Sequence, residues 1–249
     1  MTSFIKYLGL CYLVFISINA NANTTRLTLP DNVVGFSTPQ GQKLLKTSPQ
    51  QYSKQYWMLS QYFTTEYGTS FCGPASVVVV LNALQIEPAL ETNNANFTMF
   101  NQNNIFYNKE LIKEGINPVR IYARGLPIDE TADIIRKQDT IGAKATAKVM
   151  HANEFSDEQD FKKTLTKAMT EGKYIIINYN RADMGAVGGG HFSPLAAYNP
   201  GADSWLLMDV ARYKYPPALI KTSDLYKAIQ ANDSESEKPR CIIIVSKIS

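Results

Sequence analysis

The stretch Phe71-Cys72-Gly73-Pro74-Ala75-Ser76 leads directly into the apolar run Val77-Val78-Val79-Val80-Leu81-Asn82-Ala83-Leu84. An apolar segment of about twelve residues is too long for a typical buried strand and suits a buried helix. Pro74 fits the first turn of that helix, because a backbone N–H is not needed there. We therefore expect the Cys72 sulfur at the helix N-terminus, where the macrodipole and free N–H groups favour a thiolate nucleophile. A small buried cysteine that only begins a core helix is the alternative.

The second half of the chain contains the other residues that a thiol nucleophile needs. His191 is one of two histidines, and the three glycines before it let other backbone approach its ring closely. Asp209 ends a strand-like apolar run that starts at Trp205. The order Cys72, His191, Asp209, with each residue at the end of an element, is typical of a thiol acyl-transfer triad. Taken by itself, His191 could equally be a core histidine beside a glycine turn.

Three motifs are long enough to compare with known families. They are Cys72-Gly73-x-Ala75-Ser76 with Leu81-Asn82-Ala83-Leu84, Gly190-His191-Phe192-Ser193-Pro194, and Asp209-Val210-Ala211-Arg212-Tyr213-Lys214-Tyr215-Pro216-Pro217. Together they resemble the phytochelatin synthase family, in its short bacterial form, over roughly residues 44–244. The resemblance implies an α+β, papain-like cysteine proteinase fold. In that fold the helical N-terminal half carries the nucleophile helix, which packs on an antiparallel sheet from the C-terminal half.

The resemblance also implies a reaction. A family member with Cys72, His191 and Asp209 as its triad cleaves glycine from glutathione through a γ-glutamylcysteinyl thioester. The acyl group then passes to water, giving γ-Glu-Cys, or to a second glutathione, giving a phytochelatin. No cofactor is implied, but a metal-thiolate complex of glutathione is a candidate acceptor, in keeping with a role in the heavy-metal response. Two alternatives stay open: a papain-like peptidase of broader specificity, and a non-catalytic protein that binds thiol peptides or metal thiolates.

Further residues match family positions around the substrate. Asp233 and Arg240 lie seven residues apart on either side of a polar loop, and would pair with the ammonium and carboxylate of the γ-glutamyl group. Asn178, expected as the last residue of its strand, and Gly190 would line the pocket. Arg181 matches an arginine on a flap over the site, and the glycine-rich segment after it is expected to be a mobile lid.

One position departs from the family pattern. The family has a glutamine six residues before the cysteine, where it donates a hydrogen bond to the oxyanion alongside the backbone N–H of the nucleophile. Here that position is Glu66, and an ionised carboxylate would repel an oxyanion. Glu66 must therefore be protonated, point away, or be replaced by a donor such as Gln61 or the Ser70 hydroxyl. This departure is what keeps the non-catalytic alternative open.

The beginning of the chain is typical of an exported protein. Lys6 precedes the apolar stretch Tyr7–Ile18, and Ala20-Asn21-Ala22 forms an A-x-A cleavage site. We expect a signal peptide over residues 1–22, a periplasmic or secreted location, and no membrane association after cleavage. The remaining residues, 23–249, suit a single papain-like catalytic domain.

Charge and cysteine content exclude several classes of protein. The formal net charge is only +3, and no basic run suggests a nucleic-acid partner. Outside the signal peptide the cysteines are Cys72 and Cys241, too few for a disulfide framework, and the lack of a C-x-x-C pair predicts no metal site. Cys241 begins an apolar run typical of a buried strand and is expected to be inert. The expected partners are glutathione and related γ-glutamyl thiol peptides, with a homodimer as an open alternative to a monomer.

The remaining pattern indicates helices first and strands later. Asp129-Glu130 opens one helix, and Ser156–Glu171 forms another, with Ser156 and Gln159 as its capping box and Gly172 as its stop. The predicted strands are Tyr174–Ile177, Ser193–Tyr198, Ser204–Val210 and Cys241–Val245. This order favours an α+β protein with the site between its two halves.

Overall fold

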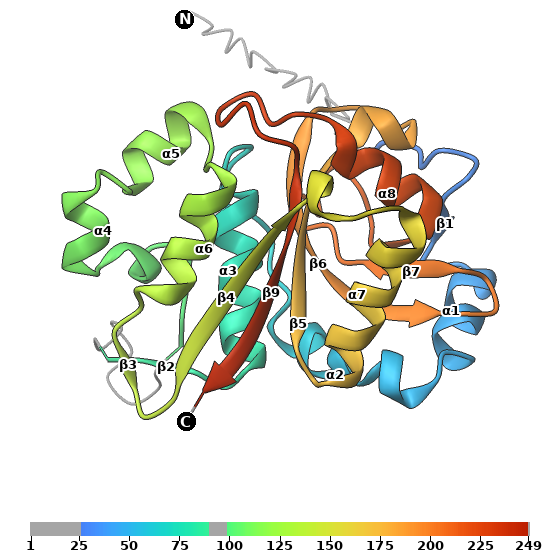
Figure 1. The fold of residues 1–249 in the computed structure, drawn as a ribbon, viewed down its shortest axis with the longest axis horizontal. Helices are drawn as coiled ribbons and strands as arrows, with labels where there is room; N and C mark the ends of the chain where they lie inside the picture. The colour runs from blue at the N-terminus through green and yellow to red at the C-terminus, as the bar shows by residue number, and fades with distance from the viewer. Residues whose placement is uncertain (1–25, 90–98, 249) are drawn as a thin grey trace, which may run out of the picture.

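The computed structural model describes residues 26–89 and 99–248, so the signal peptide predicted over residues 1–22 lies outside the described part. Its main feature is a seven-stranded antiparallel sheet in the order β1-β8-β7-β6-β5-β9-β4 (Figure 1). The strands are β1 (Val34–Gly35), β4 (Lys144–His151), β5 (Tyr174–Asn180), β6 (Gly190–Asn199), β7 (Ser204–Leu207), β8 (Ala218–Lys221) and β9 (Cys241–Ile248). Two short strands, β2 (Glu87–Pro88) and β3 (Thr140–Ile141), pair with each other separately.

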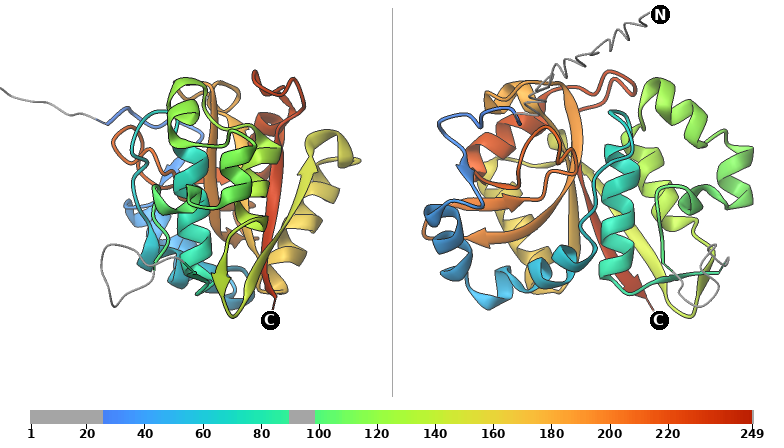
Figure 2. Two further views of the ribbon diagram at one scale, coloured as in Figure 1. Left: turned by 90° about the vertical axis from the view of Figure 1, so that its left-hand side faces the viewer. Right: turned by 180° about the vertical axis from the view of Figure 1, so that it is seen from behind.

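Helices cover both faces of this sheet, as Figures 1 and 2 show. They are α1 (Pro39–Lys46), α2 (Lys54–Tyr62), α3 (Cys72–Ala83), α4 (Lys109–Lys113), α5 (Pro118–Arg124), α6 (Ile128–Arg136), α7 (Glu158–Thr170) and α8 (Thr222–Gln230). On one face α3 contacts β5 and β6, and α6 contacts β4; on the other face α7 and α8 pack together on β5. The predicted α+β arrangement, with the cysteine-bearing helix packed on an antiparallel sheet, is therefore confirmed.

Strand β5, which lies inside the sheet between β6 and β9, is buried on both faces. Successive side chains of a strand point to opposite sides of its sheet. Tyr174 and Ile176 accordingly belong to the apolar core on the α3 side, whereas Ile175 and Ile177 belong to the core on the α7 side. Helix α3 is buried all round from Gly73 to Ala83, as expected for a helix without a polar face. Its first residue is thereby fixed relative to the sheet.

Several predicted strand boundaries differ in the structure. Pairing between β5 and β6 continues until Asn180 lies opposite Gly190, because backbone ladders do not stop where the apolar run stops. Asn178 therefore lies inside β5 and is not its last residue. Strand β7 is shorter than predicted and ends at Leu207, so Asp209 lies in the loop after the strand.

The surface helix predicted over residues 156–171 forms, but its N-terminal cap is different. The N-cap is Asp157 and not Ser156: the Asp157 carboxylate accepts a hydrogen bond from the Asp160 N–H at 2.8 Å. A carboxylate at this position also interacts favourably with the helix dipole. Gly172 ends the helix as predicted, with a φ of +78° that favours glycine.

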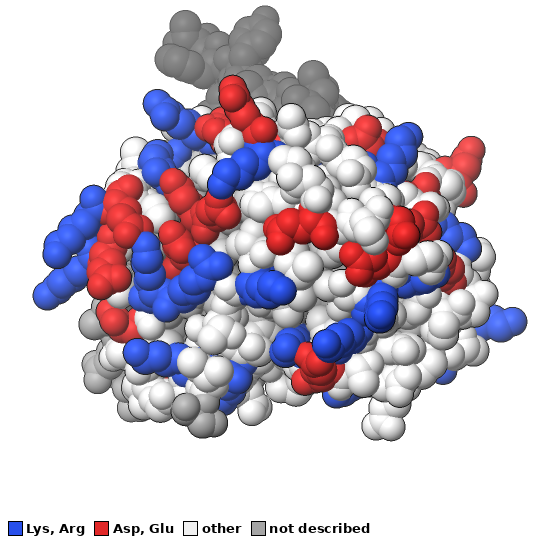
Figure 3. All heavy atoms as spheres, viewed as in Figure 1, with Lys and Arg blue, Asp and Glu red and all other residues white. Residues whose placement is uncertain are grey.

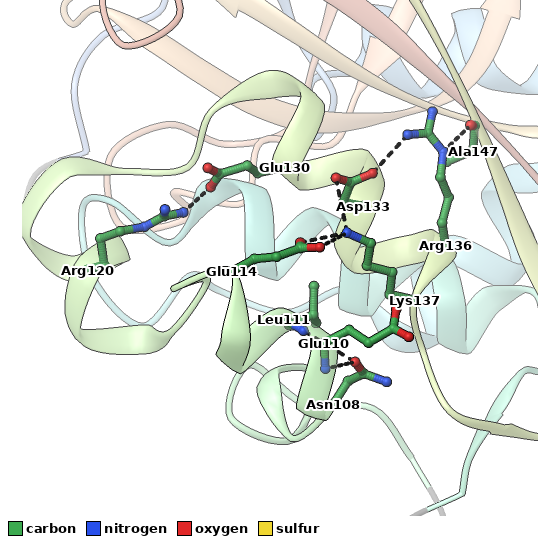
Figure 4. A network of polar contacts seen from close by, with 10 residues as sticks. All are labelled: Asn108, Glu110, Leu111, Glu114, Arg120, Glu130, Asp133, Arg136, Lys137 and Ala147. Atoms are coloured by element: carbon green, nitrogen blue, oxygen red, sulfur yellow. Dashed lines mark hydrogen bonds and ion pairs between the residues drawn. The ribbon is translucent and has the colours of Figure 1, made fainter.

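Helices α4, α5 and α6 form a group beside α3, on the left in Figure 1. Figure 4 shows the ion pairs on its surface, which are Lys137–Glu114, Arg120–Glu130 and Arg136–Asp133. Exposed pairs contribute only about 0–1 kcal/mol each. Burial of apolar residues such as Leu111, Ile121 and Ile134 therefore accounts for most of the stability of this group.

Charged side chains of both signs alternate over the face of the molecule drawn in Figure 3, most densely over the α4–α6 group. Acidic and basic side chains are thus interspersed on this face, in keeping with the low net charge of the sequence, +3. Within residues 26–89 and 99–248, every helix is too short or too polar to cross a lipid bilayer.

Candidate active site

Cys72 is the first residue of α3, and Pro74 lies in the first turn as predicted. Within the described part of the chain, no side-chain hydrogen bond caps this end of the helix, so its first N–H groups are free for a ligand. Gly73 allows close packing, because a Cβ there would lie 3.0 Å from Cδ2 of Leu126. Cys72 is half-buried, whereas the residues after it in α3 are buried. The fold thus presents one accessible thiol at the end of a buried helix.

His191 faces this thiol from strand β6. A ring nitrogen of His191, the Sγ of Cys72 and a carboxylate oxygen of Glu66 all lie within 4.8 Å of one another. The ring is 2% exposed, and its Nε2 lies 2.9 Å from Oδ1 of Asp209. With Nε2–H directed at the aspartate, Nδ1 is the ring nitrogen that remains for the thiol. Burial opposes a charge on the ring, but the charges of Asp209 and Cys72 outweigh it and raise the pKa of His191 to about 9.

Asp209 is a buried carboxylate that its neighbours hold in place. Besides the imidazole, its donors are Arg181 Nη2 at 2.7 and 2.5 Å, Tyr179 OH at 3.3 Å and the Ala211 N–H at 2.8 Å. Burial opposes ionisation of Asp209, but the charges and hydrogen bonds of His191 and Arg181 outweigh it and hold the pKa of Asp209 well below its usual range. The carboxylate therefore stays ionised and fixes the orientation of the ring.

Arg181 lies at the end of β5 and contacts Asp209. The resemblance implies a place on a flap over the substrate, but Arg181 directly follows β5 and begins the 3-10 helix η4 (Arg181–Met184). Its side chain is 7% exposed and reaches Asp209, with the guanidinium carbon 5.6 Å from the ring centroid of Tyr215. Its guanidinium is thus paired with Asp209, and its place on a flap over the substrate stays a prediction.

Glu66 points into the site. Its backbone N–H donates to the Val210 carbonyl at 3.0 Å, and its Oε1 accepts a hydrogen bond from the Tyr213 hydroxyl at 2.7 Å. Its Oε2 is buried and has no hydrogen-bond partner among the described residues. Burial raises the pKa of Glu66, and the opposing effects of His191 and of the Tyr213 hydrogen bond do not cancel this increase. A carboxylate oxygen of Glu66 lies within 4.8 Å of the Cys72 sulfur. The predicted alternative in which Glu66 points away from the site is therefore excluded.

The two alternative donors have other partners. Gln61 is exposed, and its Nε2 donates to the Trp57 carbonyl of its own helix at 2.9 Å. The Ser70 hydroxyl donates to the Tyr122 carbonyl at 3.2 Å. Neither side chain is directed to the thiol by these bonds, whereas a carboxylate oxygen of Glu66 lies within 4.8 Å of the Cys72 sulfur.

The structure brings Asp233, Arg240, Asn178 and Gly190 together next to His191. Arg240 Nη1 donates to Oδ1 of Asn178 at 2.7 Å and to Oδ1 of Asp233 at 3.3 Å. A side chain on Gly190 would clash with the Arg240 guanidinium, so glycine is needed there for the close approach. The Nε of Arg240 is buried and lacks a partner among the described residues. The paired carboxylate of Asp233 and guanidinium of Arg240 therefore lie next to His191.

The glycine-rich segment between η4 and β6 is a hydrogen-bonded turn. The Arg181 N–H donates to the Gly189 carbonyl at 3.1 Å, and the Val187 N–H donates to the Tyr215 hydroxyl at 2.8 Å. Gly188 has a φ of +126°, which favours glycine. Its opening as a lid stays a prediction.

Cys241 is fully buried in β9. Among the described residues, Cys72 and Cys241 both carry free thiols. Burial raises the pKa of Cys241 well above its usual value, so its reactive thiolate form is suppressed. This environment agrees with the inert role expected for it.

Two tyrosines of the site were not identified from the sequence. Tyr213 lies within the motif that ends at Pro217, but its partner Glu66 is 147 residues away in the chain. Tyr179 directly follows Asn178 in β5 and is fully buried. Its position opposite His191 in the β5–β6 ladder is the signal that would have identified it, once the register was known.

Comparison with known proteins gives a consistent family. A family model described as Phytochelatin synthase matches residues 24–242. Glutathione gamma-glutamylcysteinyltransferase 1 of Lotus japonicus is 31% identical over 92% of this chain and 43% of its own length. The protein of the same name in Arabidopsis thaliana is 29% identical over 92% of this chain and 45% of its length. A protein named glutathione gamma-glutamylcysteinyltransferase in Schizosaccharomyces pombe is 23% identical over 87% of this chain and 50% of its own length.

The chain spans half or less of the length of these curated relatives. Among solved structures, one described as the active wild-type Prevotella intermedia interpain A cysteine protease is similar, with 13% sequence identity and a TM-score of 0.37. That alignment covers 88% of this chain and 98% of the protease chain. At this low similarity, the role of a residue in the protease cannot be assigned to a residue of the present site.

Proposed function

The chain belongs to the phytochelatin synthase family, and from this membership we propose that it releases glycine from glutathione as a glutathione γ-glutamylcysteinyltransferase. The observation that carries the proposal is the grouping of Cys72, His191 and Asp209 at the start of α3, beside the Asp233–Arg240 pair. A thiol, a base and an orienting carboxylate are the groups that acyl transfer requires.

The first half-reaction forms a thioester. His191 takes the proton of Cys72 on Nδ1, and the sulfur attacks the carbonyl that joins cysteine to glycine in glutathione. The imidazolium then gives this proton to the departing glycine amine. Asp209 stabilises the charged ring throughout, which agrees with the raised pKa of His191, about 9. The products are free glycine and a γ-glutamylcysteinyl thioester on Cys72.

The second half-reaction transfers the acyl group. Water, deprotonated by His191, releases γ-Glu-Cys and regenerates the thiol. Attack by the amine of a second glutathione instead gives a longer peptide, and a metal-thiolate complex of glutathione is a candidate for this acceptor. A Cys–His pair supports both steps by general acid–base and nucleophilic catalysis.

We assign recognition of the substrate to the ion pair of Asp233 and Arg240, which lies next to Gly190. The γ-glutamyl group carries an ammonium and a carboxylate on one carbon atom. Asp233 would accept from the ammonium, and Arg240 would donate to the carboxylate. Arg240 is held for this role by Asn178, and its unpartnered Nε offers a further donor. A general peptide without a γ-glutamyl group lacks both charges at this point.

Incubation with glutathione tests the proposal and its alternatives. The mature protein should release glycine from glutathione, and mass spectrometry should detect γ-Glu-Cys, with longer γ-glutamyl peptides at high glutathione, where added Cd²⁺ is held as its glutathione thiolate and not as the free ion. The dipeptide Cys-Gly should be cleaved at least about tenfold less efficiently in kcat/KM, because it lacks the γ-glutamyl ammonium and carboxylate that Asp233 and Arg240 would bind. Equal cleavage of both substrates would indicate a broad peptidase. Binding of glutathione without any cleavage would indicate the non-catalytic alternative.

Glu66 is proposed as a donor to the oxyanion, together with the backbone N–H of Cys72. Tyr213 donates to Oε1, so a proton on the carboxyl group belongs on Oε2, the oxygen that lacks a partner. The protonated group then donates from Oε2, as the amide of a glutamine would. Its raised pKa keeps the donor form present to a higher pH than in an exposed glutamate.

Glu66→Gln should therefore change how the rate depends on pH. Glutamate donates only when protonated, so the wild-type rate of thioester formation should fall as pH rises through the raised pKa of Glu66. Glutamine donates at every pH. The ratio of variant to wild-type rate should be near one in acid and should rise toward about 10²–10³ above that pKa, the usual cost of losing one oxyanion donor.

Single-turnover glycine release, measured in the presence of a chelator across a pH series, gives this ratio. The other groups that take part in thioester formation are the same in both proteins, so their effect on the rate largely cancels in the ratio. A ratio of one at every pH would contradict a donor role for Glu66 and would leave the backbone as the donor.

Export is also proposed, from the pattern of Lys6, the apolar stretch and Ala20-Asn21-Ala22. A periplasmic or secreted protein meets oxidants that a cytosolic one does not. Of the two thiols among the described residues, Cys72 is the accessible one and is then more exposed to oxidation, since Cys241 is fully buried.

A further inference from the structure

We propose that Glu66, Cys72 and His191 form a binding site for a thiophilic divalent ion such as Zn²⁺, which captures the nucleophile and blocks the first half-reaction. The binding stands on the geometry alone, and only its inhibitory consequence rests on the proposed function. A site of this kind differs from a metal-thiolate acceptor, because the protein itself supplies the ligands.

The three donor atoms already have the required types and nearly the required spacing. One thiolate, one imidazole nitrogen and one carboxylate oxygen lie within 4.8 Å of one another. Bond lengths of about 2.0–2.3 Å in a tetrahedral zinc site place ligand atoms about 3.3–3.8 Å apart. Small side-chain rotations therefore suffice to close the site. A thiolate with an imidazole selects Zn²⁺ and similar ions over Mg²⁺ or Ca²⁺.

An independent observation at Glu66 points to a missing ligand. Glu66 is 5% exposed, and its Oε2 has no hydrogen-bond partner within the described ranges. The rest of the side chain is held, because Tyr213 donates to Oε1 and the Glu66 N–H donates to Val210. A buried oxygen without a partner is unfavourable, because it has lost its hydrogen bonds to water and gained none in return. An ion bound at Oε2 would remove this deficit without moving the backbone.

The imidazole is also oriented as a metal ligand usually is. Nε2 of His191 donates to Asp209, so Nδ1 is the nitrogen directed to the site. A ligating histidine commonly donates its other N–H to a carboxylate, which fixes the ring and increases its basicity. Arg181 holds that carboxylate in turn. The same contacts that orient His191 for proton transfer thus orient it for coordination.

The charges balance only because residue 66 is a glutamate. The Cys72 thiolate and the Glu66 carboxylate carry two negative charges, and with a neutral imidazole they neutralise a divalent ion. Binding releases to solvent the proton that the thiol and imidazole share and, where Glu66 is protonated, the proton on its Oε2 as well. A glutamine at this position would leave one positive charge uncompensated in a largely buried site. The half-buried side of Cys72 leaves a fourth position for water.

Co²⁺ binding without glutathione tests the site directly. Titration of the metal-free mature protein with Co²⁺ should produce a sulfur-to-cobalt charge-transfer band and the visible bands of four-coordinate cobalt, and Zn²⁺ should displace both. Glu66→Gln, which keeps the shape of the side chain, should bind at least about tenfold more weakly. Cys72→Ser should lose the charge-transfer band. The matched control Cys241→Ser should keep wild-type affinity, because Cys241 is buried in β9.

Alkylation of Cys72 provides a second measurement that needs no substrate turnover. Iodoacetamide labelling, followed by mass spectrometry, should slow by at least about tenfold in wild type when Zn²⁺ is added, and much less in Glu66→Gln. The absence of a charge-transfer band in wild type, or equal metal affinity of wild type and Glu66→Gln, would overturn the proposal. Inactivity toward glutathione would overturn the proposed function but would leave both measurements interpretable.

Discussion

Replacing Cys72 by serine is expected to stop glycine release from glutathione and to leave the fold intact. Cys72 is half-buried at the start of α3, so the exchange of sulfur for oxygen disturbs little packing. A serine hydroxyl next to His191 lacks the ionised form that the thiol reaches. Removing the nucleophile of a serine protease lowers kcat by about 10⁶, and a loss of that order is expected here. Stopped-time assays of glycine, with mass spectrometry for the acyl-enzyme, measure it.

Cys241→Ser is the matched control for this prediction. The side chain of Cys241 is fully buried in β9, and burial raises the pKa of its thiol. The variant should keep glycine release within a few-fold and lose some stability, about 1–3 kcal/mol for a hydroxyl buried without a partner. Circular dichroism of both variants reports the fold. An active Cys72 variant beside an inactive Cys241 variant would mean that the nucleophile is the other thiol.

The sequence was sufficient to locate the proposed reacting groups because each is marked by a local pattern. Pro74 and the apolar run after Cys72 indicate a helix that starts at the thiol, and the structure has α3 beginning there. The glycines before His191 mark the entry to β6. Patterns of this kind extend over a few residues, which is the distance at which helix periodicity and turn chemistry operate.

Contacts between distant segments could not be predicted in the same way. Arg181 and Asp209 are 28 residues apart, and nothing in either segment shows that the guanidinium lies under the carboxylate. The bond between Tyr213 and Glu66 depends on the placement of the loop after β7 against the segment before α3. The protonation and orientation of Glu66 were open for that reason, since both depend on burial and on neighbours from other parts of the chain.

The exact ends of strands and helices could not be predicted from the sequence either. The apolar run 174–177 indicated a strand, but β5 extends to Asn180 because its polar residues are paired on the β6 side. Asp157 and Ser156 are both good N-cap residues, and only the backbone conformation decides between them. Boundaries of this kind shift by one to a few residues, which is enough to move Asn178 from the end of a strand to its interior.

Asp209→Asn should lower the rate of thioester formation by about 10⁴, the effect of the equivalent change in a serine protease triad. An asparagine amide cannot stabilise a charged imidazole as a carboxylate does. The pKa of His191, raised to about 9 mainly by Asp209 against the effect of burial, should fall. His191 would then lose its proton at a lower pH than in wild type. The alkaline limb of the rate profile should therefore shift to lower pH. NMR titration of His191 provides the same information without turnover.

The same substitution should also destabilise the fold, and a second change separates the two effects. In Asp209→Asn the guanidinium of Arg181 is left buried without its charged partner, at a cost of about 3–5 kcal/mol in the free energy of unfolding. The double variant Asp209→Asn/Arg181→Met removes both charges and should recover most of that stability. It should not recover the rate, because the imidazolium still lacks its carboxylate. Recovery of the rate together with stability would mean that Asp209 acts only through the fold and not on His191.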